Sequence, residues 1–466
     1  MSPRRSPRVN DLGHDPIPSL LVRMALPSIT AQVVLMLYNI VDRIYIGHID
    51  QVGSLALTGV GVCFPLICLV NALTMLVGTG GGARAAIAMG EGKNEYAERI
   101  LGNCAVLAVL ISICVTLVLF FTCRPALLAF GATENTLGFA VDYFAIYVWG
   151  TLFTLTGMSL NQFITTQGFA LYSMGTVLLG AVLNIVLDPI FIFALNMGVK
   201  GAAIATVLSQ AASAIWVVLF LTGRRTKLRL TFKCLGLQRE ILGRVLSLGI
   251  SPFTMQATES LLFICLNSSL KGYGGDVAVG AATICTSAMM FITAPISGLC
   301  QGFQPFLGFN YGACNTQRVK RGFLLMLLAA VCISTFTWGV IQLFPQFFVG
   351  LFNDNPALVE VAVWALRIYA AGAFMLGAQF SCQQSFVAFG QAKVSMLLAL
   401  LRKVILLIPL IYIFPLFFTD KVFAVFLAEP VADVTAALST ATVFALRVPK
   451  LLEARAHHLP PNPPKP

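Results

Sequence analysis

The chain has 466 residues, of which 58% are hydrophobic and 11% are charged, whereas about 25% of the residues of a soluble domain are charged. This composition excludes a water-soluble globular protein, because so few charged residues cannot cover its surface. The net charge of +11 does not indicate nucleic-acid binding either, since the Lys and Arg residues lie in short loops and tails and not on one face of a soluble domain.

The chain begins with a polar segment, residues 1–19, which has charges and prolines but no short apolar core. We expect a cytoplasmic tail here and no cleavable signal peptide. A first lobe follows, residues 20–222, in which apolar runs of about 20 residues, the length that crosses a bilayer as a helix, recur. Its predicted spans are 20–47, 54–82, 100–122, 138–161, 170–196 and 201–222.

A basic cytoplasmic linker, residues 223–240, leads to a second lobe, residues 241–447. Residues 448–466 are expected to form a Pro-rich tail. The fold class is therefore an all-α polytopic membrane protein, with twelve transmembrane helices in two bundles of six. The predicted spans of the second lobe are 243–270, 277–308, 323–346, 359–383, 394–417 and 421–446, of which the last is interrupted by Glu429, Pro430 and Asp433.

The distribution of Lys and Arg among the loops sets the orientation of these spans. Loops on the cytoplasmic side of a membrane protein are enriched in both residues. We therefore expect a multi-pass protein of a bacterial inner membrane with both termini in the cytoplasm. The richer side holds Lys93, Arg99, Arg224, Arg225, Lys227, Arg229, Lys233, Arg239, Arg318, Lys320, Arg321 and Lys393, and the opposite side holds Arg124, Lys200, Lys271 and Lys421.

The second lobe repeats the first at a constant offset. Six spans return the chain to the side on which it started, so both lobes enter the membrane in the same direction and are related by an axis along the membrane normal. Transporters with such repeats bind their substrate between the lobes and alternate access by moving one against the other. The pairs that are 222 positions apart are Phe130 and Phe352, Tyr147 and Tyr369, Gln162 and Gln384, and Gly168 and Gly390.

Two acidic residues of the first lobe, Asp42 and Asp188, lie inside predicted spans. A charged side chain at the bilayer centre costs about 2.5–3.5 kcal/mol on insertion scales, and such residues are functional by default. Asn184 lies one helical turn before Asp188 on the same face, Thr206 adds a hydroxyl, and Tyr38 precedes Asp42. Because burial disfavours the ionised form of an acid, a proton, Na⁺ or an organic cation can each neutralise such a site, which is the chemistry of an antiporter.

Each acid also has a structural interpretation. Asp42 stands next to Arg43, and near the outer surface either an ion pair or hydration would suffice for it. Asp188 could bond to backbone groups freed by Pro189. In the second lobe, Glu259 opens a possible second cation site.

The eleventh span carries two bases, Arg402 and Lys403, which could pair with acids of the same lobe and make those acids structural. Glu429 and Asp433 share a face of the last span, and we rank them below Asp42, Asp188 and Glu259 as functional candidates.

Pro27 in the first span removes a backbone donor. It predicts a bend that would move the helix carrying Asp42, with a static kink as the alternative.

The sequence contains no Gly-x-x-x-x-Gly-Lys-Ser/Thr phosphate loop and no His in the middle of a span, and its twelve Cys lack paired spacing. We therefore expect no enzyme, no catalytic residue, no metal framework, and no cofactor apart from a coupling ion, H⁺ or Na⁺.

Five segments, from roughly Leu20 to Asp433, together resemble the multidrug and toxic compound extrusion (MATE) exporters. Their details are most similar to the MepA-type bacterial branch, close to the DinF-like branch. The segments are Met36-Leu-Tyr-Asn-Ile-Val-Asp-Arg-Ile-Tyr-Ile-Gly47, the Gly-rich end of the second span, Asn184-Ile-Val-Leu-Asp-Pro-Ile-Phe-Ile192, Gln304-Pro-Phe-Leu-Gly-Phe-Asn-Tyr-Gly-Ala313 and Ala428-Glu-Pro-Val-Ala-Asp433.

The resemblance implies two six-helix bundles, antiport of H⁺ or Na⁺ against organic cations, and a contribution to antibiotic resistance. The tenth-span acid of the NorM-type sodium site is missing from Gly377–Gln384, which favours the first-lobe acids. By position, Asp42 and Asp188 match the acids of the DinF-like pattern, with Asn184 and Thr206 beside them as possible further Na⁺ ligands. Pro27 matches the bending proline of the family. Glu259 matches the seventh-span acid of NorM-like members.

A lipid-linked oligosaccharide flippase of the same broad superfamily is the alternative. It would need a cationic cleft for pyrophosphate, whereas the buried charges here are mainly acidic, apart from Arg402 and Lys403. A membrane-embedded enzyme is a third hypothesis, and the missing catalytic motifs argue against it. We expect a monomer that contacts membrane lipids and small organic cations but no nucleic acid.

Overall fold

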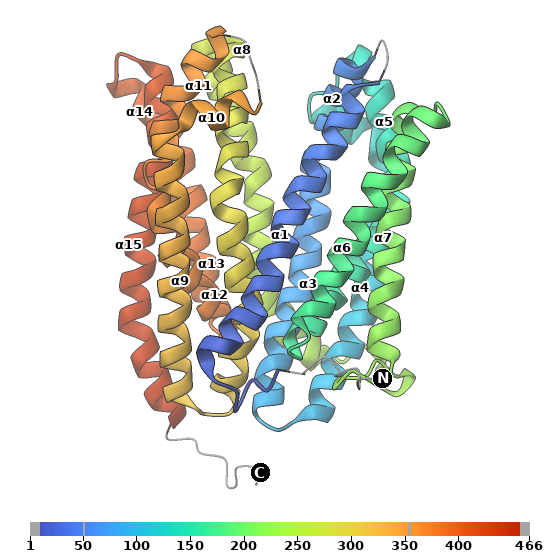
Figure 1. Ribbon diagram of the computed structural model, residues 1–466, viewed down its shortest axis with the longest axis vertical. Helices are drawn as coiled ribbons and strands as arrows, with labels where there is room; N and C mark the ends of the chain where they lie inside the picture. Colours follow the sequence, from blue (N-terminus) through green and yellow to red (C-terminus); the bar gives the residue numbers. More distant parts are fainter. Residues whose placement is uncertain (1–9, 50–51, 353–355, 457–466) are drawn as a thin grey trace, which may run out of the picture.

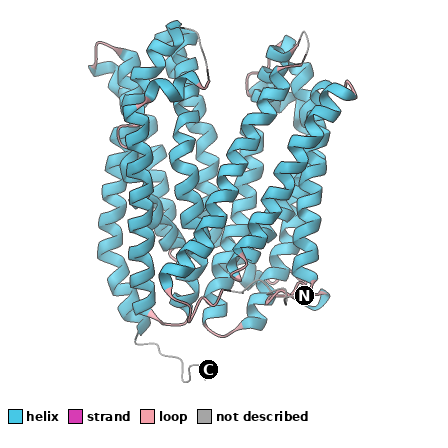
Figure 2. Ribbon diagram, viewed as in Figure 1, coloured by secondary structure: helices cyan, strands magenta, loops and turns pink. Residues whose placement is uncertain are grey.

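The computed structural model describes residues 10–49, 52–352 and 356–456. Within these ranges all regular secondary structure is helical (Figure 2). The N-terminal lobe comprises α1 (Ile17–Gly47), α2 (Gly53–Val62), α3 (Phe64–Gly90), α4 (Asn94–Ala129), α5 (Glu134–Thr166), α6 (Ala170–Pro189) and α7 (Gly198–Thr222). The C-terminal lobe comprises α8 (Arg239–Gly312), α9 (Thr316–Leu343), α10 (Pro345–Gly350), α11 (Pro356–Tyr369), α12 (Leu376–Ala388), α13 (Ala392–Leu400), α14 (Ile408–Phe417) and α15 (Lys421–Ala456).

The predicted membrane spans fall on these helices. Among the described residues, ten helical stretches are long and apolar enough to cross a membrane, and the bent pair α11 and α12 makes an eleventh. The remaining prediction, 243–270, is the first part of α8, which breaks at Gly275 (φ 64°) before it continues as the next span. This first part is less apolar because it carries Glu259 among several Thr, Ser and Gln residues.

The last helix departs from the prediction. α15 runs to Ala456, nine residues beyond the expected end of the lobe at 447 and into the predicted tail. The helix continues because Val448 and Leu452, one turn apart, are buried against the core of the C-terminal lobe. Residues 1–9 and 457–466 of the two predicted tails lie outside the described residues.

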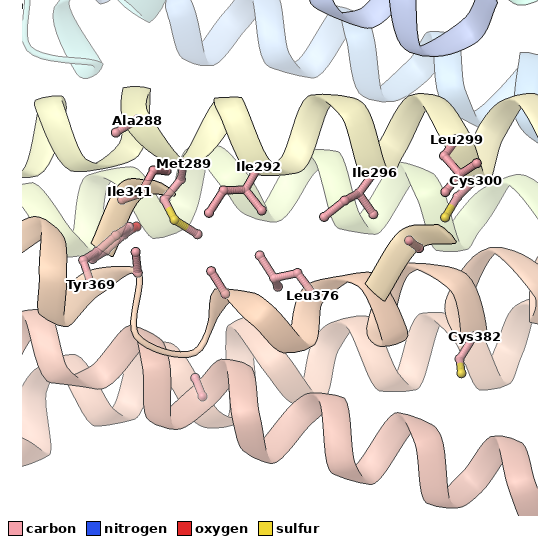
Figure 3. Packing of buried hydrophobic residues seen from close by; sticks show 14 of the residues in the cluster. Ala288, Met289, Ile292, Ile296, Leu299, Cys300, Ile341, Tyr369, Leu376 and Cys382 are labelled. Carbon is pink, nitrogen blue, oxygen red and sulfur yellow. The ribbon is translucent and has the colours of Figure 1, made fainter. Parts of the chain in front are cut away.

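An apolar core between α8 and the α11–α12 pair holds the C-terminal lobe together (Figure 3). Ile292 and Ile296 are spaced one turn apart on α8 and fully buried, and Leu376 lies on the facing side. Further along, Cys300 and Cys382 are buried as free thiols and act as small apolar side chains in this core.

The two lobes share the predicted repeat. Gly168 ends α5 with φ +90°, and Gly390 ends α12 with φ +77°. At both positions the next residue bonds back five residues, Phe169 to Ile164 and Gln391 to Phe386. This is the helix ending that a left-handed glycine permits, and its occurrence 222 positions apart confirms the repeat.

The start of α1 and the end of α15 lie at the same end of the helices, which we call the terminal face (Figure 1). The lobes meet near this face, and their helices diverge toward the opposite face (Figure 1). Glycines bring the backbones of α3 and α8 into direct contact there. A Cβ on Gly249 would lie 1.8 Å from the carbonyl oxygen of Leu76, and a Cβ on Gly312 would lie 2.2 Å from that of Ile87.

Polar contacts also tie the lobes together at the terminal face. Arg455 of α15 forms an ion pair with Glu91, which follows α3, at 2.8 Å. Partial burial would raise the pKa of Glu91, but hydrogen bonds from Lys93 and Arg455 outweigh it and hold that pKa below its usual value. The segment before α1 bridges the lobes as well, since Asn10 donates to the carbonyl of Gly168 and Arg318 donates to that of Asp15.

Replacing Gly249 with Ala is expected to lower the melting temperature of the purified protein, because a backbone carbonyl cannot move aside for a methyl group as a flexible side chain can. Gly243→Ala is the matched control in the same helix, since a Cβ there would meet nothing within 4 Å. Ala at a helical position free of clashes stabilises by about 0.5–1 kcal/mol over Gly. Equal melting temperatures for the two variants would contradict close packing at Gly249.

Candidate functional site

Three helices of the N-terminal lobe bring the predicted site residues together. Asn184 and Asp188 share a face of α6, as predicted, and Asn184 Nδ2 donates to Asp188 Oδ1 at 3.1 Å. The same amide lies 3.4 Å from Thr206 Oγ1 of α7. Asp188 is 0% exposed and Asn184 1% exposed, so a carboxyl group and its amide partner are enclosed within the lobe.

Asp42 of α1 completes this group. Its carboxyl lies close enough to that of Asp188 for the two groups to interact. Three buried oxygen atoms have no hydrogen-bond partner among the described residues: Asp42 Oδ1, Asn184 Oδ1 and Asp188 Oδ2. Unpaired buried polar atoms are costly, and carboxylate and amide oxygens suit hard cations. The donor set therefore fits a proton or a small hard cation.

The contacts differ from the ion-pair interpretation of Asp42 and from the backbone interpretation of Asp188. Arg43 is exposed and lies over the ring of Phe64, 5.8 Å from its centroid, and in the described part of the chain it forms no ion pair with Asp42 within 4 Å. Asp188 accepts its hydrogen bond from the side chain of Asn184 and not from backbone freed by Pro189. The chain after this proline instead widens into a π-helical turn, Ile190–Ala194.

Tyrosine side chains surround the acids. Tyr38, the residue predicted from α1, lies within electrostatic range of Asp42 and Asp188. Tyr143 and Tyr147 of α5 were not predicted as site residues from the sequence. Tyr143 lies near Asp42, and its ring stacks on Tyr147 with centroids 6.0 Å apart and 14° between planes. Their spacing of one helical turn inside a span was the available signal, and their ring faces can attract an organic cation.

Glu259 lies apart from these residues, in the C-terminal lobe. Its carboxylate forms an ion pair with Lys403, which also donates to the carbonyl oxygen of Met255 at 2.8 Å. The predicted pairing of the bases of the eleventh span with acids of their own lobe is confirmed. Glu259 is therefore already paired with a resident cation, unlike the first-lobe acids.

The neighbouring base neutralises two further acids. Arg402 Nε donates to Asp433 Oδ1 at 2.6 Å, and its terminal nitrogen lies 3.2 Å from Glu429 Oε1. Arg402 and Lys403 both belong to a π-helical turn, Leu401–Leu407, between α13 and α14. Together these residues form the C-lobe charge network, in which two bases face three carboxyl groups.

Pro27 lies where α1 crosses α8. α1 continues through this proline from Ile17 to Gly47. Next to it the two helices touch, since a Cβ on Gly298 would lie 2.6 Å from the Cα of Ile29, and one on Gly302 would lie 2.7 Å from the carbonyl oxygen of Met24. A bend at Pro27 would therefore change a contact between the lobes; the bend itself stays a prediction.

Two repeated bundles of membrane-spanning helices, with a pair of acids inside the spans of one of them, define a multi-pass membrane protein of the transporter class. A family model described as MatE matches residues 27–190 and 253–413. The chain therefore belongs to the MatE family, the family of the MATE multidrug exporters, as the sequence segments indicated.

Individual proteins agree with this assignment. Multidrug export protein MepA of Staphylococcus aureus is 26% identical over 434 residues, which cover 91% of this chain and 93% of that protein. A MATE crystal structure in the straight conformation has a TM-score of 0.89 at 25% identity, covering 95% of this chain and 98% of the other. A MATE crystal structure in the bent conformation has a TM-score of 0.88 at 25% identity, covering 96% and 98%.

Proposed function

We propose that the protein is a secondary active multidrug exporter of the bacterial inner membrane, which exchanges organic cations for H⁺ or Na⁺. The observation that carries the proposal is the pair of acids formed by the fully buried Asp188 and the half-buried Asp42. Together with Asn184 they present three buried oxygens that lack hydrogen-bond partners among the described residues. The membership of the chain in the MatE family supports it, as does the similarity to proteins named for multidrug export.

One site serves two kinds of cation in this mechanism. A proton or Na⁺ at Asp42, Asp188, Asn184 and Thr206 neutralises the acid pair, and a bulky organic cation can do so only when the small ion has left. Tyr38 offers an aromatic face to that organic cation. Because both ligands neutralise the same carboxyl groups, binding of one opposes binding of the other, which couples export to the ion gradient.

Alternating access follows from the contact between the lobes. The lobes touch at the terminal face, which the loop charges place in the cytoplasm, and their helices diverge on the other side (Figure 1). The structure is therefore the outward-facing arrangement in this mechanism. Pro27 lies where α1 meets α8, so bending α1 there would move Asp42 relative to the second lobe. The existence of bent and straight structures of a MATE protein supports this role.

The flippase alternative is less well supported. Lys403 and Arg402, the bases that favoured it, are both paired with carboxylates of their own lobe. A pyrophosphate would have to compete with three carboxyl groups for these two bases. The charge balance of the described C-lobe network therefore does not favour a large anionic ligand.

The test is efflux of ethidium from proteoliposomes that contain the full chain. Efflux driven by an imposed pH gradient or by an imposed Na⁺ gradient is the expected result, and the effective gradient identifies the coupling ion. Vesicles in which an ionophore has collapsed the gradient are the control. Folded protein that moves ethidium equally with and without a gradient, or not at all under either, would contradict cation-coupled multidrug export.

A further inference from the structure

The linker between the lobes lies along the side of α4. The backbone N–H of Arg229 donates to Glu98 Oε1 at 3.1 Å, and that of Gln238 donates to Asn103 Oδ1 at 2.6 Å. Between these two contacts the backbone of Cys234 touches α4, because a Cβ on Gly102 would lie 2.0 Å from its carbonyl oxygen. The linker is thus held against one helix over about one and a half turns.

These contacts set the level of the linker relative to the membrane. The first two turns of α4 carry the charged residues Glu95, Glu98 and Arg99, and from Ile100 onward the helix is apolar up to Arg124. Gly102 and Asn103 therefore mark the place where α4 enters the hydrocarbon. A segment packed on α4 at this level lies among the lipid headgroups and not deep in the cytoplasm.

The linker is also fixed from its other side. Gln167 Oε1, at the end of α5, accepts hydrogen bonds from Thr226 Oγ1 and from the backbone N–H groups of Lys227 and Leu228, at 2.7, 2.7 and 2.8 Å. Gln167 is fully buried. One buried amide oxygen thus holds the start of the linker in a defined conformation, so that its exposed side chains have a fixed direction.

The exposed side chains of the linker are apolar and basic. Phe232 is 94% exposed, and Leu235 and Leu237 are 41% and 50% exposed. We call these residues, together with the exposed bases around them, the linker patch. The bases of the linker patch are Arg224, Arg225, Lys227, Arg229, Lys233 and Arg239.

We propose that the linker patch binds the headgroups of anionic phospholipids in the leaflet at the terminal face, with Phe232 inserted at the boundary between headgroups and acyl chains. Each Lys or Arg close to an anionic membrane surface contributes about 1 kcal/mol. Aromatic side chains are enriched at this boundary, and a basic segment with apolar residues on its other side binds in the interface plane. If the linker patch faced water, the almost fully exposed ring of Phe232 would contact neither headgroups nor acyl chains.

This binding site is independent of the proposed transport function. It would anchor the N-terminal lobe to the bilayer at the covalent linker between the lobes, so that the C-terminal lobe moves relative to a lobe fixed by lipid. The proposed lipid binding differs from the general excess of positive charge in cytoplasmic loops. It requires that Phe232 lies at headgroup depth and that the linker patch prefers anionic over zwitterionic lipid.

The test uses Phe232→Trp in the full chain, reconstituted into bilayers with brominated acyl chains. The bilayers are made either of phosphatidylcholine alone or of phosphatidylcholine with phosphatidylglycerol. The emission added by the new Trp, taken as the difference from the wild type, is expected to be blue-shifted and quenched by bromine when phosphatidylglycerol is present. High salt and removal of phosphatidylglycerol should both reduce the quenching, since they remove the electrostatic attraction.

A charge-matched pair of triple variants separates the linker patch from the net charge of the protein. In the Phe232→Trp background, replacing Arg224, Lys233 and Arg239 with Gln should abolish the dependence on phosphatidylglycerol. Replacing the exposed bases Lys320, Arg321 and Lys393 of the C-terminal lobe with Gln should leave it intact. Emission typical of water without bromine quenching would overturn the proposal and leave the surface for a soluble partner. Equal quenching in both lipids would overturn the preference for anionic headgroups.

Discussion

Proteoliposomes that contain Asp188→Asn are expected to show no more efflux of organic cations than protein-free vesicles, while the variant stays folded. The amide keeps an oxygen that can accept the hydrogen bond from Asn184 Nδ2, 3.1 Å away in the wild type, so the packing of α6 is preserved. It cannot take up a proton or carry the negative charge that an exchanging cation neutralises. The measurement is ethidium efflux under the gradient that drives the wild type, together with the melting temperature.

Two further variants show whether the effect belongs to the acid pair. Asp42→Asn should also abolish efflux, because the carboxyl groups of Asp42 and Asp188 interact as one site. Asp142→Asn in the same lobe removes a half-exposed acid that pairs with Lys200 at 3.5 Å, and it should transport like the wild type. Wild-type efflux by Asp188→Asn would remove this residue from the coupling role.

The fold was accessible from the sequence because the membrane simplifies the problem. A spanning helix must be apolar over about 20 residues, so the breaks between apolar runs locate the loops. The first part of α8, with Glu259 and its polar neighbours, shows the weak point of this rule, since it is a helix that fails the apolar criterion. The end of α15 differs from the expected start of the tail at 448 because the burial of Val448 and Leu452 against the lobe extends the helix.

The first-lobe site was predictable in part for a similar reason. An intramembrane acid stands out by its cost, and the spacing of Asn184 and Asp188 puts them on one helix face. Nothing in the spacing predicts which residues of other helices face this group. The tyrosines of α5 lie over a hundred positions from Asp42 along the chain, and only the packing of α1 against its neighbours brings them together.

The acids inside the spans of the two lobes have different partners, although the lobes repeat one architecture. In the N-terminal lobe, Asp42 and Asp188 keep oxygens without partners. In the C-terminal lobe, Glu259 is paired with Lys403, so its charge is neutralised by a residue that cannot leave. This asymmetry favours coupling through the N-terminal lobe.

Arg402→Met is expected to lower the free energy of unfolding by about 3–5 kcal/mol, because removing one partner of a buried ion pair leaves uncompensated charge. Arg402 donates to Asp433 and lies within 4 Å of Glu429, and both acids are almost fully buried. The measurement is the melting temperature of the purified protein, with Arg367→Met of α11, an exposed base of the same lobe, as the control. An unchanged melting temperature for Arg402→Met would show that the two acids are neutral without the base.

Neutralising the acids should reverse much of this effect. The triple variant Arg402→Met, Glu429→Gln, Asp433→Asn has no net charge to compensate at these positions, so it is expected to be more stable than Arg402→Met alone. Replacing a whole buried ion-pair set is often nearly neutral, whereas breaking it is costly. If the triple variant is as unstable as Arg402→Met, the arginine stabilises the lobe through packing of its side chain in the π-helical turn, and the charge balance of the C-lobe network is not what holds α15 in place.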